Sequence, residues 1–192
     1  MTSRGNGRMT PRTAMLALGA AVALTGVVPS VGGATRATTD HRLIGTWERT
    51  NSCTALVRAM RRARLNERVM RESIAGGGYY SSPTKVDLAT PCKGAVNVRH
   101  SHFFTAAGAF GSRDETGSQV DDGDYRIIAR NTLTFPSHQR EFGFRIRVRY
   151  RIAGDSLRFT VLVPHRCVAK CQVATAWAIS AFYAGRPFRR QM

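Results

Sequence analysis

The most regular hydrophobic pattern in the chain lies at residues 142–152, whose sequence is FGFRIRVRYRI. Apolar side chains occupy every second position, and a period of two predicts a β-strand with one apolar face. Gly154 and Asp155 follow shortly afterwards, and this pair favours a two-residue type II′ turn. The register set by that turn places the apolar residues of 142–152 opposite apolar residues of 156–163. We therefore predict a β-hairpin with its apolar face toward the core.

The polar face of this hairpin is a row of arginines. It consists of Arg145, Arg147, Arg149 and Arg151 on the first strand and of Arg158 on the second, opposite Arg151. Unpaired charges are very costly in a core, so we expect this face to point outward. Arg126 and Arg130 are expected to extend it. The row is a candidate anion-binding surface, although the wet side of a sheet would also account for it.

Most of the remaining chain has short strand patterns separated by glycine-containing turns. The predicted strands are 42–49, 96–105, 109–113, 124–130, 132–136, 142–152, 156–163 and 172–183. Their short spacing predicts antiparallel meander order, and eight strands are about the number that closes into a small barrel. The predicted fold is therefore mainly β, an eight-stranded antiparallel meander β-barrel. A two-sheet β-sandwich is the alternative.

One stretch between the first two predicted strands has helical rather than strand periodicity. Apolar residues recur at helical spacing within 56–74, arginines cover the other side, and three glycines at 76–78 end the pattern. Asn66 is expected to divide the stretch into two short helices. We therefore predict a short helical insertion after the first strand, with its apolar side packed on the domain.

The N-terminal segment 1–34 has the pattern of a secretory signal peptide. Arginines without acids precede an apolar run at 14–28, and small residues at Gly32 and Ala34 suit a cleavage site. The apolar run is shorter than the roughly 18–20 residues that span a bilayer. We therefore predict a secreted, extracellular protein without a transmembrane span, whose single domain is 35–192.

The charge of the chain is its most unusual bulk property. The sequence has 29 Lys+Arg against 12 Asp+Glu, and loss of Arg4, Arg8 and Arg12 with the signal peptide would lower the formal net charge from +17 to +14. Such a field favours anionic partners, although solubility and an arginine-rich codon bias would also produce it. Aromatic residues fall mostly on predicted inward faces, which argues against base-stacking surfaces and specific nucleic-acid binding. We expect a monomer.

The chain has four cysteines, Cys53, Cys92, Cys167 and Cys171. An even number in a secreted chain predicts two disulfides, for which three connectivities are possible. We favour Cys53–Cys92 and Cys167–Cys171. His165 and the last two cysteines could instead ligate zinc, but such a site usually needs a fourth ligand and reduced thiols.

Two stretches resemble a known group of proteins. Gly45-Thr46-Trp47 in the first predicted strand, followed by helices and a meander, resembles the lipocalin and wider calycin barrels. The stretch 100–127, HSHFFTAAGAFGSRDETGSQVDDGDYRI, resembles lipocalin-like secreted domains of high-GC Gram-positive bacteria, a functionally uncharacterised group. The resemblance implies that Trp47 packs at the closed end of the barrel beneath a late arginine, for which Arg186 is the candidate. The helical insertion departs from the lipocalin pattern, so a calycin-like shape is expected rather than true lipocalin membership.

Two clusters of polar residues are candidates for chemistry. His100 and His102 are two residues apart on a predicted strand, so they share its inward face as a metal half-site, as contacts to a buried ligand, or simply as hydrogen-bonded interior histidines. Asp121, Asp122 and Asp124 surround a glycine in an order typical of a β-turn, without the further ligands of a calcium loop. We predict neither a metal nor a cofactor.

The sequence has no G-x-S-x-G elbow, no H-E-x-x-H motif and no phosphate-binding glycine loop, so an enzyme is the least favoured class. The leading hypothesis is a secreted, non-enzymatic binding protein that holds a small apolar ligand in the barrel interior. The expected contacts are Trp47, His100, His102, Tyr125 and Tyr150. The alternative is a surface module that binds an anionic cell-envelope polymer or lipid through the arginine row.

Overall fold

The structure is a computed structural model that describes residues 39–81, 85–113, 116, 118–182 and 186–191. The predicted signal peptide, 1–34, lies outside the described residues. The described part of the chain belongs to one compact unit that contains nine strands and four helices. The strands are β1 (Gly45–Asn51), β2 (Val98–Phe104), β3 (Ala109–Arg113), β4 (Gln119–Asp124), β5 (Arg126–Ala129), β6 (Thr132–Thr134), β7 (Arg147–Ala153), β8 (Ser156–Val161) and β9 (Phe188–Arg190). The helices are α1 (Cys53–Arg62), α2 (Glu67–Ala75), α3 (Pro136–Phe142) and α4 (Lys170–Phe182).

All nine strands form one antiparallel sheet in the order β4-β3-β2-β1-β9-β8-β7-β6-β5. The two strands at the ends of this order, β4 and β5, follow each other in the chain with only Tyr125 between them. The sheet therefore has to curl until its two edges meet at this residue, which makes it a nearly closed barrel. The predicted mainly-β barrel is confirmed, with nine strands in the described residues instead of eight, and the sandwich alternative is set aside.

The hairpin of β7 and β8 has the predicted register. Val148 lies opposite Val161, Tyr150 opposite Phe159 and Arg151 opposite Arg158. Gly154 has a φ of 54°, as the first turn position of a type II′ hairpin requires. The alternation of apolar and charged residues therefore determines both the pairing and the faces of this hairpin.

The helical insertion after β1 is also as predicted. The Ser52 hydroxyl accepts a hydrogen bond from the Ala55 backbone N–H and caps α1, and the Asn66 side chain caps α2 by accepting from the Val69 N–H. Apolar residues of both helices, including Met60 and Ile74, form a second hydrophobic cluster outside the barrel core. Such capping satisfies the unpaired N–H groups at the start of each helix.

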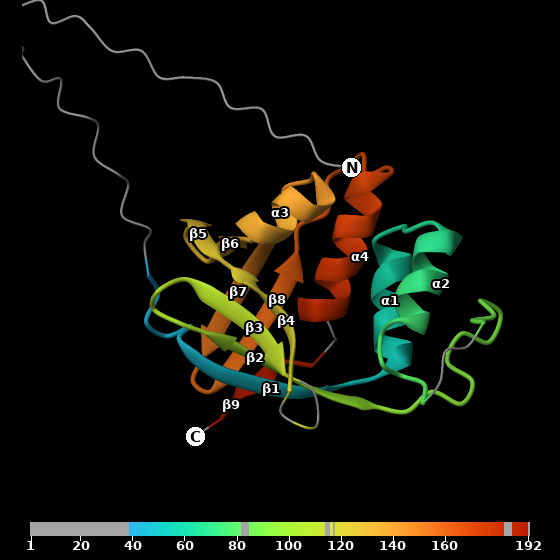
Figure 1. Ribbon diagram of the computed structural model, residues 1–192, viewed down its shortest axis with the longest axis horizontal. Coiled ribbons are helices and arrows are strands. Elements are labelled where there is room, and N and C mark those ends of the chain that lie inside the picture. The colour runs from blue at the N-terminus through green and yellow to red at the C-terminus, as the bar shows by residue number, and fades with distance from the viewer. Residues whose placement is uncertain (1–38, 82–84, 114–115, 117, 183–185, 192) are drawn as a thin grey trace, which may run out of the picture. The chain divides into compact units, whose positions relative to one another are not determined.

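The prediction of a strand at 172–183 is wrong, because most of this segment lies in helix α4. Figure 1 shows α4 standing between the strands and the pair of helices α1 and α2. Ala174 and Phe182 of α4 belong to the barrel core, whereas Ala176 and Ile179 belong to the second cluster. A helix that is buried on two sides has apolar residues nearly all round, so it lacks the amphipathic stripe that distinguishes a helix from a buried strand.

Three smaller differences between the predicted and the observed elements concern short segments. The segment 121–124, predicted as a turn, lies in strand β4, where it pairs with β3. Residues 142–145 are not strand, because α3 begins at Pro136 and ends at Phe142, followed by the C-cap residue Gly143, which has a φ of 61°. Proline at the first turn and a left-handed glycine at the C-cap are ordinary helix boundaries. The three-residue strand β9 has no counterpart among the predicted strands.

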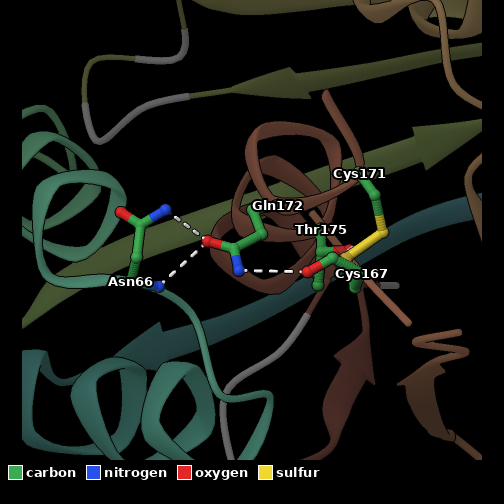
Figure 2. The surroundings of a disulfide bond; sticks show 5 residues. All are labelled: Asn66, Cys167, Cys171, Gln172 and Thr175. Carbon is green, nitrogen blue, oxygen red and sulfur yellow. Dashed lines mark hydrogen bonds between the residues drawn. A yellow bond between two sulfur atoms is a disulfide. The ribbon is translucent and has the colours of Figure 1, made fainter. Parts of the chain in front are cut away.

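The predicted disulfides Cys53–Cys92 and Cys167–Cys171 are both present. Figure 2 shows how the second one is connected to the helical layer. The Gln172 side chain accepts from the Asn66 backbone N–H at 3.0 Å and donates to the Cys167 carbonyl at 3.0 Å. The disulfide loop before α4 is therefore fastened to the start of α2.

Candidate functional site

The arginine face consists of Arg145, Arg147, Arg149, Arg151 and Arg158, and all five side chains are exposed. The pairing of the strands continues this face sideways. Thr134 of β6 lies between Arg147 of β7 and Arg126 of β5. Arg149 has Thr132 on one side and Thr160 on the other. Threonines therefore lie between the arginines across the sheet, and Thr132 and Thr134 are buried at these positions.

Acids do not neutralise this surface. Within the described part of the chain, the ion pairs join Arg42 to Asp40, Arg68 to Glu72, Arg71 to Glu67, and Arg99 to Glu48, and none includes a residue of the arginine face. Like charges on adjacent positions repel one another, and an approaching anion relieves that repulsion. The arginine face is therefore a positively charged surface without an ion-pair partner among the described residues.

The side chains on the inner side of the same hairpin pack in the core and so fix the strands that carry the arginine face. Val148 and Leu157 are completely buried, and Tyr150 is 2% exposed. The Tyr150 hydroxyl donates to an Asp40 carboxylate oxygen at 3.0 Å. The side-chain hydrogen bond from Arg42 and this bond from Tyr150 hold the pKa of Asp40 below its usual value, so the carboxylate stays ionised. Burial, together with the bond to Asp40, raises the pKa of Tyr150 and keeps its hydroxyl protonated.

One neighbouring arginine was not anticipated from the sequence. Arg189 of β9 is exposed and lies opposite Ser156 of β8, beside the strand that carries Arg158. On its other side it faces Glu48 of β1, which pairs with Arg99 at 2.6 Å. The acid Glu48 thus marks where the positive surface ends. A strand of three residues has too little periodicity to be recognised in a sequence.

Trp47, expected as a ligand contact, is completely buried and fully engaged by the protein. Its indole N–H donates to the Leu43 carbonyl at 2.8 Å. The guanidinium carbon of Arg190 lies 4.2 Å from the ring centre, in a cation–π contact. Arg186, the residue expected to cover Trp47, is exposed instead. A late arginine does pack on the tryptophan, but it comes from β9.

His102 is likewise fully buried, and both of its ring nitrogens have partners. Nε2 lies 2.6 Å from the Ala181 carbonyl oxygen and Nδ1 lies 2.9 Å from the Ser112 hydroxyl. A carbonyl only accepts, so Nε2 carries the proton and Nδ1 accepts from Ser112. Burial, the largest cause, holds the pKa of His102 well below its usual value. This neutral histidine joins the barrel wall to α4.

The two histidines do not form a metal site by themselves. The ring centres of His100 and His102 are 4.7 Å apart. The described residues contain no group of three or more histidine, cysteine or acidic side chains that could hold a metal ion. His100 borders a cleft at the end of the barrel, together with Tyr79 and Trp177.

The remaining expected contacts are separated from this cleft. Tyr125 is 5% exposed and donates its hydroxyl proton to the Thr105 carbonyl at 2.7 Å, and Tyr150 is occupied with Asp40. Phenylalanines of the core and the apolar side of α4 fill the interior around them. The five residues expected to line one interior space therefore do not meet in one: four are buried core residues, and of the five only His100 borders this cleft.

The acidic cluster has a structural use at Asp124. Its carboxylate accepts hydrogen bonds from the Ser137 backbone N–H, at 2.8 Å, and from the Ser137 hydroxyl. Burial alone would raise the pKa of Asp124, but the hydrogen bonds from Ser137 hold it below its usual value. Asp124 therefore supports the start of α3. The structure does not describe the side chains of Asp121 and Asp122.

No protein-family model, curated protein or solved structure matches this chain. The resemblance to lipocalin-like domains stays a prediction.

Among the described residues, no helix combines the length and the apolar character needed to cross a bilayer.

Proposed function

We propose that this chain is a secreted, non-enzymatic binding module that holds an anionic cell-envelope polymer through the arginine face. The observation that supports this most directly is that four exposed arginines of one hairpin face, Arg147, Arg149, Arg151 and Arg158, have no carboxylate partner among the described residues, and that the exposed Arg145 precedes them in the chain. Two disulfides support an oxidising location for the protein.

The spacing of the arginine face suits a polymer better than a single small anion. Side chains two positions apart on a strand are about 7 Å apart, so the row from Arg147 to Arg151 extends over roughly 14 Å. A chain with repeated phosphate or carboxylate groups can contact several of these positions at once. Guanidinium groups bind such groups with two parallel hydrogen bonds, which lysine cannot do.

The same face argues against reading of nucleic-acid bases. Tyr150 and Phe159, the aromatic residues of the hairpin, are buried on the inner side of the sheet. Binding through the arginine face therefore depends on charge and on guanidinium geometry rather than on base stacking.

The test is the affinity for polyglycerol phosphate as a function of salt, measured for the wild-type domain and for a variant with Arg145, Arg147, Arg149 and Arg151 all changed to Ser. We expect affinity to fall with rising salt in the wild type, and to fall by about a hundredfold at low salt in the variant. A second variant with four lysines at these positions should lose part of the affinity but keep the salt dependence.

In the matched control, four exposed arginines of the helical layer are changed to Ser, and they are Arg58, Arg61, Arg68 and Arg71. This control therefore has the same net charge as the quadruple serine variant of the arginine face. It should bind polyglycerol phosphate nearly as well as the wild type. Equal losses in the two variants would mean that only net charge matters, and would refute a site on the arginine face. Binding to vesicles of anionic phospholipid but not to the soluble polymer would indicate a lipid surface as the partner instead.

A further inference from the structure

A cleft of about 870 Å³ lies at the end of the barrel. None of the described residues that line it belongs to the arginine face. Its walls come from the end of β1, the segment Gly76–Tyr79 after α2, the segment leading into β2, and the last turns of α4. The volume falls within the range of about 300–1,000 Å³ that small-molecule sites occupy.

The side chain of Asn51 is the most informative part of this cleft. Asn51 is 4% exposed, and its Oδ1 atom is buried without a hydrogen-bond partner among the described residues. A buried amide oxygen without a donor costs free energy, so such groups are rare in folded proteins. If the amide turned this oxygen toward the cleft, a ligand that donates a hydrogen bond to it there would remove this cost.

The other lining residues indicate what kind of ligand this is. Tyr79 and Trp177 provide aromatic surface, and Val98 and Ala181 provide small apolar surface. Uncharged polar side chains of the lining are Asn51, Asn97, Thr116 and Ser180, together with Ser112, whose hydroxyl is already engaged with His102. Arg99, also in the lining, is ion-paired with Glu48. Burial raises the pKa of Tyr79 to about 12, so its hydroxyl is neutral as well.

We propose that this cleft binds a neutral saccharide. Sugar hydroxyls both donate and accept hydrogen bonds, so they match the amide and hydroxyl side chains of the lining. The C–H face of a pyranose ring carries weak positive charge and packs on the negative face of an aromatic ring such as Trp177. A purely apolar ligand would leave the Asn51 oxygen unpaired, and a carboxylate would place an acceptor against that acceptor.

The two tryptophans of the chain make a direct binding assay available. Trp47 is completely buried, whereas Trp177 borders the cleft. Titration with glucose, N-acetylglucosamine, cellobiose and chitobiose at millimolar concentrations should therefore change the fluorescence of Trp177 with at least one of these probes. In Trp177→Phe the ligand-induced change should disappear, because only the buried Trp47 still emits. The absence of a saturable response to all four probes would overturn the proposal, and so would saturable binding of octanoate without any saccharide.

The decisive variant is Asn51→Leu, which replaces the unpaired amide by a branched apolar side chain with the same number of non-hydrogen atoms. We expect the free protein to unfold at the same or a higher temperature, because no internal hydrogen bond is lost. We also expect saccharide affinity to fall about tenfold, because one donated hydrogen bond is lost. Lower thermal stability together with unchanged affinity would show that Asn51 has a structural role, and would refute the site.

A second variant, Ser180→Trp, fills the cleft from the half-buried end of α4 and should also abolish binding. The quadruple serine variant of the arginine face serves as the control and should bind the saccharide like the wild type. Loss of polymer binding in that variant with saccharide binding retained, or the reverse, distinguishes failure of one proposal from failure of the other.

Discussion

The arginine face and the cleft differ in how the chain builds them. The arginine face comes mainly from two consecutive strands whose side chains alternate, so its members are close in sequence as well as in space. The cleft brings together residues as distant as Asn51 and Ser180, from four elements and a loop. A site of the first kind is visible in a sequence because the periodicity of a strand defines it. A site of the second kind depends on tertiary packing and becomes visible only in the fold.

The largest expected effect comes from the buried apolar side chains on the inner side of the hairpin. It tests whether the arginine face depends on their packing. Val148→Asp places a charge at a position that is completely buried, and should destabilise the domain by more than about 4 kcal/mol. Urea unfolding followed by circular dichroism measures this change. The adjacent substitution Arg149→Val, on the outer side, should change stability little. Similar losses for both would contradict the assignment of faces.

The two disulfides should contribute unequally, because they close loops of very different length. Cys53–Cys92 joins residues 39 positions apart and Cys167–Cys171 joins residues 4 apart. Loop entropy then predicts losses of about 4 and about 2 kcal/mol for the respective double serine variants. The first disulfide also anchors α1, close to Asn51, so its removal should weaken saccharide binding more than polymer binding. Equal effects on both ligands would show that the two sites are not independent.

The pH dependence of the free energy of unfolding should show the effect of burying His102 in its neutral form. Its pKa is lowered in the folded state, so the unfolded chain binds the proton more readily. Stability from this group is therefore present above about pH 6.5, and is lost as the pH falls below that value, by up to about 1.4 kcal/mol per pH unit. Unfolding curves between pH 7.5 and roughly pH 5 should show this slope, and His102→Gln should flatten it. A slope unchanged in His102→Gln would assign it to other groups.

The smallest expected effect concerns repulsion within the arginine face. Arg151→Glu places an acid directly opposite Arg158 and should stabilise the hairpin by a few tenths of a kcal/mol. The gain should vanish in high salt, and polymer affinity should fall at the same time. Thermal unfolding at two salt concentrations measures it. An unchanged stability at low salt would mean that repulsion between these arginines is already screened, and a loss of stability would contradict the prediction.

The hairpin register, the helical pair and the short disulfide Cys167–Cys171 could be predicted because each depends on local chemistry, whereas Cys53–Cys92 is favoured among three possible connectivities. Turn residues, caps and cysteine spacing act over short stretches of chain. The same approach failed at α4, whose sequence QVATAWAISAF is apolar all round because both sides are buried. It also failed at 121–124, where pairing with β3 overrides the turn preference of aspartate and glycine.

The expected interior contacts show a different limit. Alternation along β2 correctly places His102 on the inner side of the sheet, but no sequence pattern shows that a helix occupies that space. The partners of its ring nitrogens, Ser112 and the Ala181 carbonyl, are 10 and 79 positions away. Hydrogen bonds between residues so far apart in the sequence depend on the assembled fold. The lack of a hydrogen-bond partner among the described residues for the side-chain oxygen of Asn51 also depends on the fold.

The order of the strands has a consequence for how fast the protein folds. Strands β2 to β4 and strands β7 and β8 pair across short turns, whereas β1 reaches β2 across the helical insertion and β6 reaches β7 across α3. The pairing of β1 with β9, by contrast, joins Glu48 to Arg189 across most of the described chain. The entropy of closing a loop grows with its length, and contacts between distant residues slow folding. We therefore expect two early meanders and a slow final step in which β9 closes the barrel.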